Sequence, residues 1–182
     1  MLKLKNKKII NLLSFCLLIS VIVANSFFTI KQFKVLEQFH KIQMDLPVFT
    51  DSAVIVILIL IQLTASITVV VIQTLFVTFV TNFITHKRLK FSNFFPLIIL
   101  ANITSIILNM IVFSIAGLNN LQDLQWVGWS PSSQLLSVGF IYLYLSNLDS
   151  SIANNLKIKI CIIIFSITYG LTFIVQSLMT FV

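Results

Sequence analysis

Glycine, proline, cysteine and acidic residues are all scarce in this chain. Its 182 residues include four glycines, three prolines, two cysteines and five acidic residues. Four glycines cannot form a phosphate-binding loop, and no Walker, G-x-S-x-G or H-E-x-x-H pattern occurs. Cys16 and Cys161 lie in separate apolar runs, so we interpret them as small packing residues. We therefore expect a protein that is not an enzyme, with no catalytic, cofactor-binding or metal-binding residues.

Charged residues are also rare, and none lies within the centre of an apolar run. The chain is 58% hydrophobic and 9% charged, which is too little polar surface to cover a water-soluble globule of this size. Lipid should be its main solvent. Pumps and proton-coupled carriers commonly place an ionisable residue inside a transmembrane helix, so the lack of one disfavours both classes.

Five apolar runs are candidate transmembrane helices, because a bilayer core takes roughly 20 residues of helix. They cover about residues 9–30, 53–84, 94–117, 132–148 and 160–182. We predict an all-α, polytopic helical bundle with about five transmembrane helices, forming a single domain over residues 1–182. The fourth run is the shortest, and whether it crosses the membrane fully stays open.

The basic residues are divided unequally between the two sides of these runs. With five crossings, nine of the twelve Lys and Arg residues lie on one side and three on the other. Because cytoplasmic loops are enriched in Lys and Arg, the N-terminus is predicted to be cytoplasmic. Abundant Ile, Asn, Lys and Phe indicate an AT-rich bacterial genome, hence a multi-pass protein of the bacterial cytoplasmic membrane. A cleaved secretory signal is disfavoured, since the first apolar run is longer than roughly 18 residues.

The connections between the runs carry the interfacial residues. Residues 31–52 form an outer loop in which Phe33, Leu36 and His40 or Phe39 predict a short amphipathic helix. A metal site in this loop is disfavoured because it contains one histidine. Ser92 or Asn93, followed by Pro96, predicts the start of the third run. The expected interfacial anchors are Lys87, Arg88, Lys90, Trp126 and Trp129.

Uncharged polar residues recur with helical spacing inside two of the runs. Gln62, Ser66 and Gln73 share one face of the second run, and Asn102, Ser105 and Asn109 lie along the third. Either these side chains join helices by hydrogen bonds, or they line a polar cavity or recognise a partner's transmembrane helix. The sequence leaves both interpretations open.

The chain from residue 50 onward resembles bacterial members of the Yip1 family, which are small proteins with five predicted spans. The similarity lies in FVTNFITHKRLKFSNFFPLIILANITSIILNMIV, where a long span ends in a basic turn and a helix with proline follows, and in GFIYLYLSNLDSSIANNLKIKICIIIF. The glycine usual in the basic turn is missing, and so are the motifs of eukaryotic members. The resemblance implies a non-catalytic membrane protein that acts through other membrane proteins, as some bacterial relatives do beside ABC-type exporters.

Three functional hypotheses follow. The leading one is an accessory subunit that associates with a larger membrane complex, which the resemblance implies is an ABC-type transporter. The alternatives are an autonomous component that transports or binds a small solute, and an immunity protein against a membrane-active peptide. The expected partners are the lipid bilayer and another membrane protein. Nucleic acid is not expected, because the basic residues flank apolar runs and form no patch with interleaved aromatics.

Overall fold

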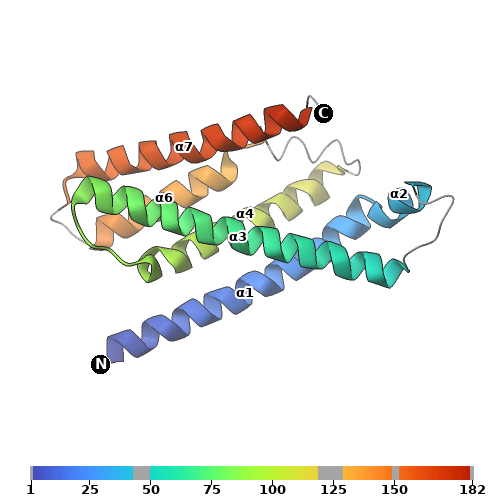
Figure 1. The fold of residues 1–182 in the computed structure, drawn as a ribbon, viewed down its shortest axis with the longest axis horizontal. Coiled ribbons are helices and arrows are strands. Elements are labelled where there is room, and N and C mark those ends of the chain that lie inside the picture. Colours follow the sequence, from blue (N-terminus) through green and yellow to red (C-terminus); the bar gives the residue numbers. More distant parts are fainter. Residues whose placement is uncertain (1, 43–49, 119–128, 149–151, 181–182) are drawn as a thin grey trace.

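The computed structural model describes residues 2–42, 50–118, 129–148 and 152–180, and the described residues contain helices and no strand. The all-α prediction is therefore confirmed. The helices are α1 (Leu2–Gln32), α2 (Val35–Ile42), α3 (Asp51–Thr85), α4 (Phe91–Ala116), α6 (Ser132–Leu148) and α7 (Asn154–Thr180) (Figure 1).

In the described part of the chain, four helices are long and apolar enough to cross a membrane. They are Ile9–Gln32, Asp51–Thr85, Phe91–Ala116 and Asn154–Leu178. Four such helices indicate a multi-pass membrane protein. Helix α6 has 17 residues, which corresponds to about 25 Å and is shorter than a typical hydrocarbon core of about 30 Å.

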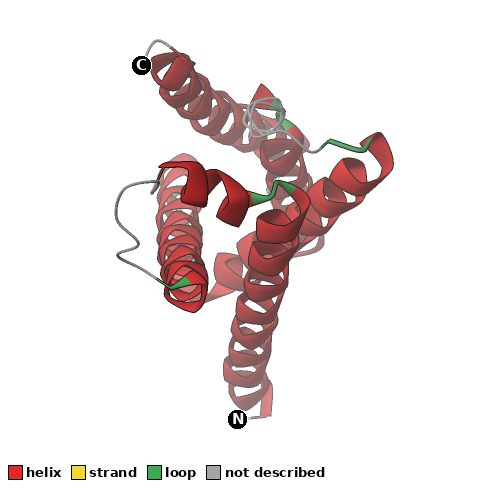
Figure 2. Ribbon diagram, turned by 90° about the vertical axis from the view of Figure 1, so that its right-hand side faces the viewer, coloured by secondary structure: helices red, strands yellow, loops and turns green. Residues whose placement is uncertain are grey.

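Helix α4 is central among the longer helices and packs against α1, α3 and α6. Helix α7 lies at the edge of the bundle against α6 and α3. The beginning of α1 and the end of α7 lie at opposite ends of the molecule (Figure 1). The view turned by 90° also places them on opposite sides (Figure 2). The chain therefore enters and leaves this bundle at different ends.

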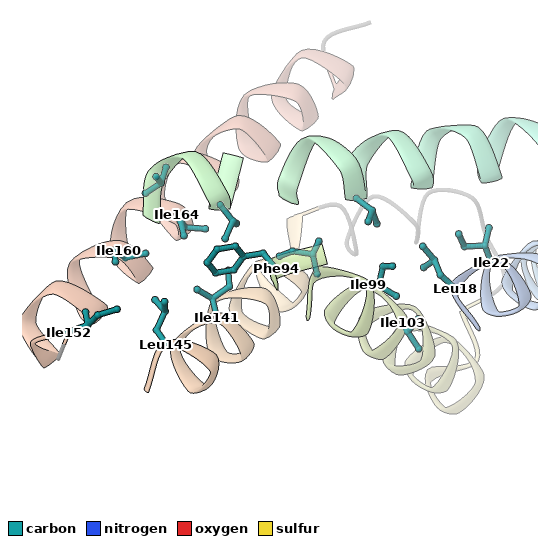
Figure 3. Close-up of a cluster of buried hydrophobic side chains, with 14 residues drawn as sticks. Leu18, Ile22, Phe94, Ile99, Ile103, Ile141, Leu145, Ile152, Ile160 and Ile164 are labelled. Atoms are coloured by element: carbon teal, nitrogen blue, oxygen red, sulfur yellow. The ribbon is translucent and has the colours of Figure 1, made fainter. Parts of the chain in front are cut away.

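The buried core consists of apolar side chains from all of these helices except α2. Leu18 and Ile22 of α1 approach Ile99 and Ile103 of α4, while a second group joins α4, α6 and α7 (Figure 3). In that second group the fully buried ring of Phe94 packs edge-on against Tyr144, with 5.5 Å between ring centroids. Many other large apolar side chains face outward; they are about 70% exposed at Phe83 and 64% at Leu12. Helices that are apolar all round suit a lipid environment.

The connection between α1 and α2 is a sharp bend rather than a continuous amphipathic helix. Lys34 adopts the left-handed conformation, with φ 49°, and separates the two helices. Phe33 lies before the bend and is fully buried, with its ring perpendicular to that of Phe113 at 5.2 Å. The predicted short amphipathic helix is present as α2, but the predicted grouping of Phe33 with Leu36 on its face is wrong, because Phe33 precedes this helix and belongs to the core.

The basic turn between α3 and α4 is closed by Asn82. Its Nδ2 donates to the Leu89 carbonyl at 2.9 Å, and its Oδ1 accepts from the Leu89 amide at 2.7 Å. His86 takes the left-handed conformation, with φ 54°, at a place where glycine has no steric cost. Helix α4 begins at Phe91 with Lys90 as its N-cap. The predicted cap at Ser92 or Asn93 is wrong because both residues already lie within the first turn.

Candidate functional site

Gln62, one of the predicted polar residues of α3, pairs with α1. The hydroxyl of Ser26, which is 1% exposed, is 2.7 Å from the Gln62 Oε1 and also lies 2.9 Å from the Ile22 carbonyl. On α1, the serine inside the apolar run VIVANSFF is the sequence sign of this contact. Gln62 therefore joins two helices of the same chain.

Gln73 and Asn102 form a second interhelical pair, between α3 and α4. Asn102 Nδ2 donates to Gln73 Oε1 at 3.2 Å and to the carbonyl of Ile98 at 2.8 Å. Interhelical polar contacts of this kind contribute about 0.5–2 kcal/mol each. Two of the residues predicted from the helical spacing are thus brought together by a hydrogen bond between two helices of the same chain.

A third pair, between α6 and α7, was not predicted from the sequence. Gln134, which is 7% exposed, donates from Nε2 to Thr172 Oγ1 at 3.1 Å. The Thr172 hydroxyl itself donates to the carbonyl of Thr168 at 3.0 Å. The sequence does contain a pattern that could have predicted a polar contact of α7. Thr168, Thr172 and Gln176 place a polar residue at every fourth position of this helix.

The other predicted polar residues are not brought into these pairs. Ser105 is 6% exposed, whereas Ser66 and Asn109 are half-buried. Within the described part of the chain the side chains of these three residues form no hydrogen bond. The predicted polar faces are therefore divided among separate helix contacts rather than forming one continuous stripe.

A groove lies between α3 and α7 on the side of the bundle. Its volume is about 570 Å³. Its apolar lining consists of Val69, Ile72, Phe76, Ile167, Leu171 and Val175, and its polar lining consists of Gln73, Thr168, Thr172 and Gln176. Its walls therefore come from two helices that are long and apolar enough to cross a membrane.

The hydrogen-bonding capacity of this groove is only partly used. The hydroxyls of Thr168 and Thr172 donate to their own helix at 2.7 Å and 3.0 Å. Gln73 accepts from Asn102 through Oε1, and its two N–H groups have no acceptor among the described residues. The Gln176 amide makes no hydrogen bond within the described part of the chain. An amide left unpaired in hydrocarbon costs about 4–8 kcal/mol relative to water, so the groove favours an occupant that can hydrogen-bond.

The predicted interfacial residues lie at the two ends of the bundle. Arg88 and Lys90 are exposed, and Lys87 is half-buried beside them. Trp126 lies outside the described residues. Trp129 packs its ring against Phe173, with 5.1 Å between centroids, and its carbonyl accepts a hydrogen bond from the Tyr169 hydroxyl at 3.3 Å. Trp129 therefore helps to hold the start of α6 against α7.

The described acidic residues of the outer loop contact separate side chains rather than forming a cluster: Glu37 Oε2 lies 3.8 Å from Lys34 Nζ, and Asp51 contacts His40. His40 Nε2 lies 2.9 Å from Asp51 Oδ1, and both side chains are more than half exposed. The described residues contain no group of three potential metal ligands. An exposed pair of this kind contributes about 0–1 kcal/mol, so it connects α2 to the start of α3 only weakly.

The geometry therefore offers two things: polar pairs that hold neighbouring helices together, and one lateral groove with unused amide groups. The described residues that line the groove carry no charge. Comparison of the chain with protein-family models, with curated proteins and with solved structures finds no match.

Proposed function

We propose that this protein is a non-catalytic accessory subunit that associates with a larger membrane complex through the groove between α3 and α7. The observation that carries the proposal is the pair of incompletely satisfied amides, Gln73 and Gln176, in an otherwise apolar groove. Lipid acyl chains have no hydrogen-bonding groups. A protein partner within the membrane can supply them, and so can remove the cost of leaving these amides unpaired.

The depth of the groove supports a partner inside the membrane. At 1.5 Å per residue, Gln73 lies roughly 18 Å from the end of α3 at Thr85, and Gln176 lies roughly 25 Å from Lys159 near the start of α7. The end of α3 and the start of α7 lie at the same end of the bundle, where the basic α3–α4 turn is also found (Figure 1). The groove therefore extends from about the middle of the bilayer towards its opposite surface.

The proposed topology has five crossings, with the N-terminus in the cytoplasm of a bacterium. Helix α6 runs antiparallel to both α4 and α7, and the described basic residues of the α3–α4 turn and of α7 lie at the end where α1 begins (Figure 1). Such clustering of positive charge is typical of a cytoplasmic side. Local thinning of the bilayer at modest cost accommodates a helix as short as α6.

The proposed partner is an ABC-type transporter. This part of the proposal comes from the resemblance of residues 79–112 and 139–165 to bacterial Yip1-family proteins, some of which work beside such exporters. The resemblance and the groove are independent of each other. Together they favour a subunit that acts by contact with another membrane protein.

An autonomous carrier is less well supported than an accessory subunit. A solute pathway needs polar groups that follow one another through the bundle. Here Ser26–Gln62, Gln73–Asn102 and Gln134–Thr172 lie at three different helix contacts, so they do not follow one another along a single path. The polar groups that remain available face the lateral groove.

Purification of the tagged protein from its native host in mild detergent tests the proposal. We expect a membrane protein, and specifically a transporter subunit, to co-purify at a fixed ratio with the wild-type chain. The Gln73→Leu, Gln176→Leu double variant should lose it, whereas Gln62→Leu should retain it. Gln62→Leu is a matched control because Ser26 keeps its bond to Ile22. A monodisperse wild-type protein without a partner contradicts the accessory function and favours a carrier or an immunity protein.

A further inference from the structure

We infer that the occupant of the α3–α7 groove is a transmembrane helix of a partner protein that carries an uncharged carboxamide side chain, Asn or Gln, between the middle of the bilayer and the surface opposite the basic end of the bundle. This inference rests on the proposed function and specifies the chemistry of the partner. It is drawn from the shape of the groove, from the hydrogen-bonding groups that it leaves unused, and from the lack of charge among its described lining residues.

The shape of the groove fits the ridge of a helix. Val69, Ile72, Gln73 and Phe76 recur at the spacing of one face of α3, and the polar residues of α7 recur at every fourth position. The groove therefore follows the two helices lengthwise. Side chains on a third helix form ridges along the same spacings of three and four residues, and ridges of this kind pack into interhelical grooves.

The unused polar groups favour a carboxamide over other side chains. Gln73 offers two N–H donors, while Gln176 offers two donors and a carbonyl acceptor. An Asn or Gln side chain has both donors and an acceptor, so one such residue can pair with these amides in both directions. A hydroxyl has a single donor and satisfies fewer of them.

A charged occupant is disfavoured by the surroundings of the two amides. The described lining residues include no carboxylate or ammonium group that would neutralise it. A charge at this depth without a counter-ion is expensive. The partner helix is therefore expected to be uncharged where it contacts Gln73 and Gln176.

A lipid chain and a second copy of the protein fit less well. An acyl chain fills the apolar part of the groove but leaves the amides unpaired. Two copies that used the same face would place two concave surfaces opposite each other, and neither groove would be filled. A convex helix that brings its own polar residue meets both requirements.

The test uses synthetic apolar helices and full-length protein in liposomes. One peptide is a polyleucine transmembrane helix with a single Asn about one turn from its centre, towards the surface opposite the basic end of the bundle, and its control has Leu at that position. Association is measured by energy transfer between labelled peptide and labelled protein. One interhelical hydrogen bond of about 0.5–2 kcal/mol changes the association constant by roughly two- to thirty-fold. We expect the Asn peptide to bind the wild-type chain more tightly than the Leu peptide by about this factor.

The variant Gln176→Leu should remove the preference for the Asn peptide, whereas Gln62→Leu should leave it unchanged. Gln176 makes no hydrogen bond within the described chain, so its replacement does not disturb the fold, and circular dichroism of both variants checks this. Equal binding of the two peptides overturns the carboxamide inference. A preference that survives Gln176→Leu overturns the site.

Energy transfer between two labelled copies of the protein, lost in Gln176→Leu, would assign the groove to a second copy instead. The experiments distinguish an error in the partner's chemistry from an error in the proposed accessory function. If the peptides bind equally while a transporter still co-purifies, only the partner chemistry is wrong. If no partner co-purifies, the accessory function itself is wrong.

Discussion

At the scale of single residues, Asn102 shows that helical spacing identifies polar residues on a helix face but does not predict which of them contact another helix. It lies on the same helix as Asn109, at a similar position on the surface of α4, yet only Asn102 reaches a partner on α3. The difference depends on which helix lies opposite. That information comes from the packing of α4 between α1 and α3, which no local pattern contains.

Asn102→Leu should therefore act on stability. The substitution removes the bond to Gln73, so we expect the free energy of unfolding to fall by about 0.5–2 kcal/mol. Titration with sodium dodecyl sulfate, followed by circular dichroism, measures this change. Asn109→Leu is the matched control on the same helix and should change stability little. Similar losses in both variants would contradict the assignment of Asn102 as a structural residue.

Asn82 is expected to be the most sensitive residue of the basic turn. Asn82→Ala removes both of its bonds to the Leu89 backbone and leaves polar groups of the turn without partners, which corresponds to about 1–3 kcal/mol of stability. The same titration measures the loss. The exposed Asn155 provides the control substitution Asn155→Ala. An Asn82→Ala protein as stable as the wild type would show that the turn does not depend on this side chain.

At the scale of helices, apolar runs locate the elements well because lipid-exposed helices must satisfy their backbone hydrogen bonds internally. Helix α6 occupies residues 132–148, and α3 extends only slightly beyond residues 53–84. The ends are less predictable. Helix α7 begins at Asn154, before Lys157 and Lys159, because charged residues at a membrane surface can belong to a helix as well as to a loop. The bend at Lys34 also lacks a glycine that would have marked it.

The topology of α6 can be tested with single cysteines. In a background of Cys16→Ala and Cys161→Ala, we expect Ser130→Cys to react with a membrane-impermeant maleimide in intact cells. Ala153→Cys should react only after the cells are permeabilised. The cysteine-free background is the control for labelling. Reaction of both positions in intact cells would mean that α6 does not cross.

At the scale of the whole molecule, the all-helical class and a membrane location follow from composition and charge. The groove does not, since its walls come from helices separated by nearly a hundred residues in the chain. The sequence identified Gln73 as polar and periodic, and the fold adds that Gln176 lies in the same groove. To predict a site built from distant helices, one must know which helices are neighbours. That order depends on contacts between helices, such as Phe94 with Tyr144, and not on the pattern of any single apolar run.

The central position of α4 has a consequence for biogenesis. Two of its neighbours, α1 and α3, precede it in the chain, but α6 follows it. At synthesis rates of about 5–20 residues per second, Tyr144 leaves the ribosome roughly 3–10 s after Phe94. During that interval the nascent helix has no α6 to cover its aromatic face. An insertion factor that holds α4 at the translocon would protect it until α6 is made.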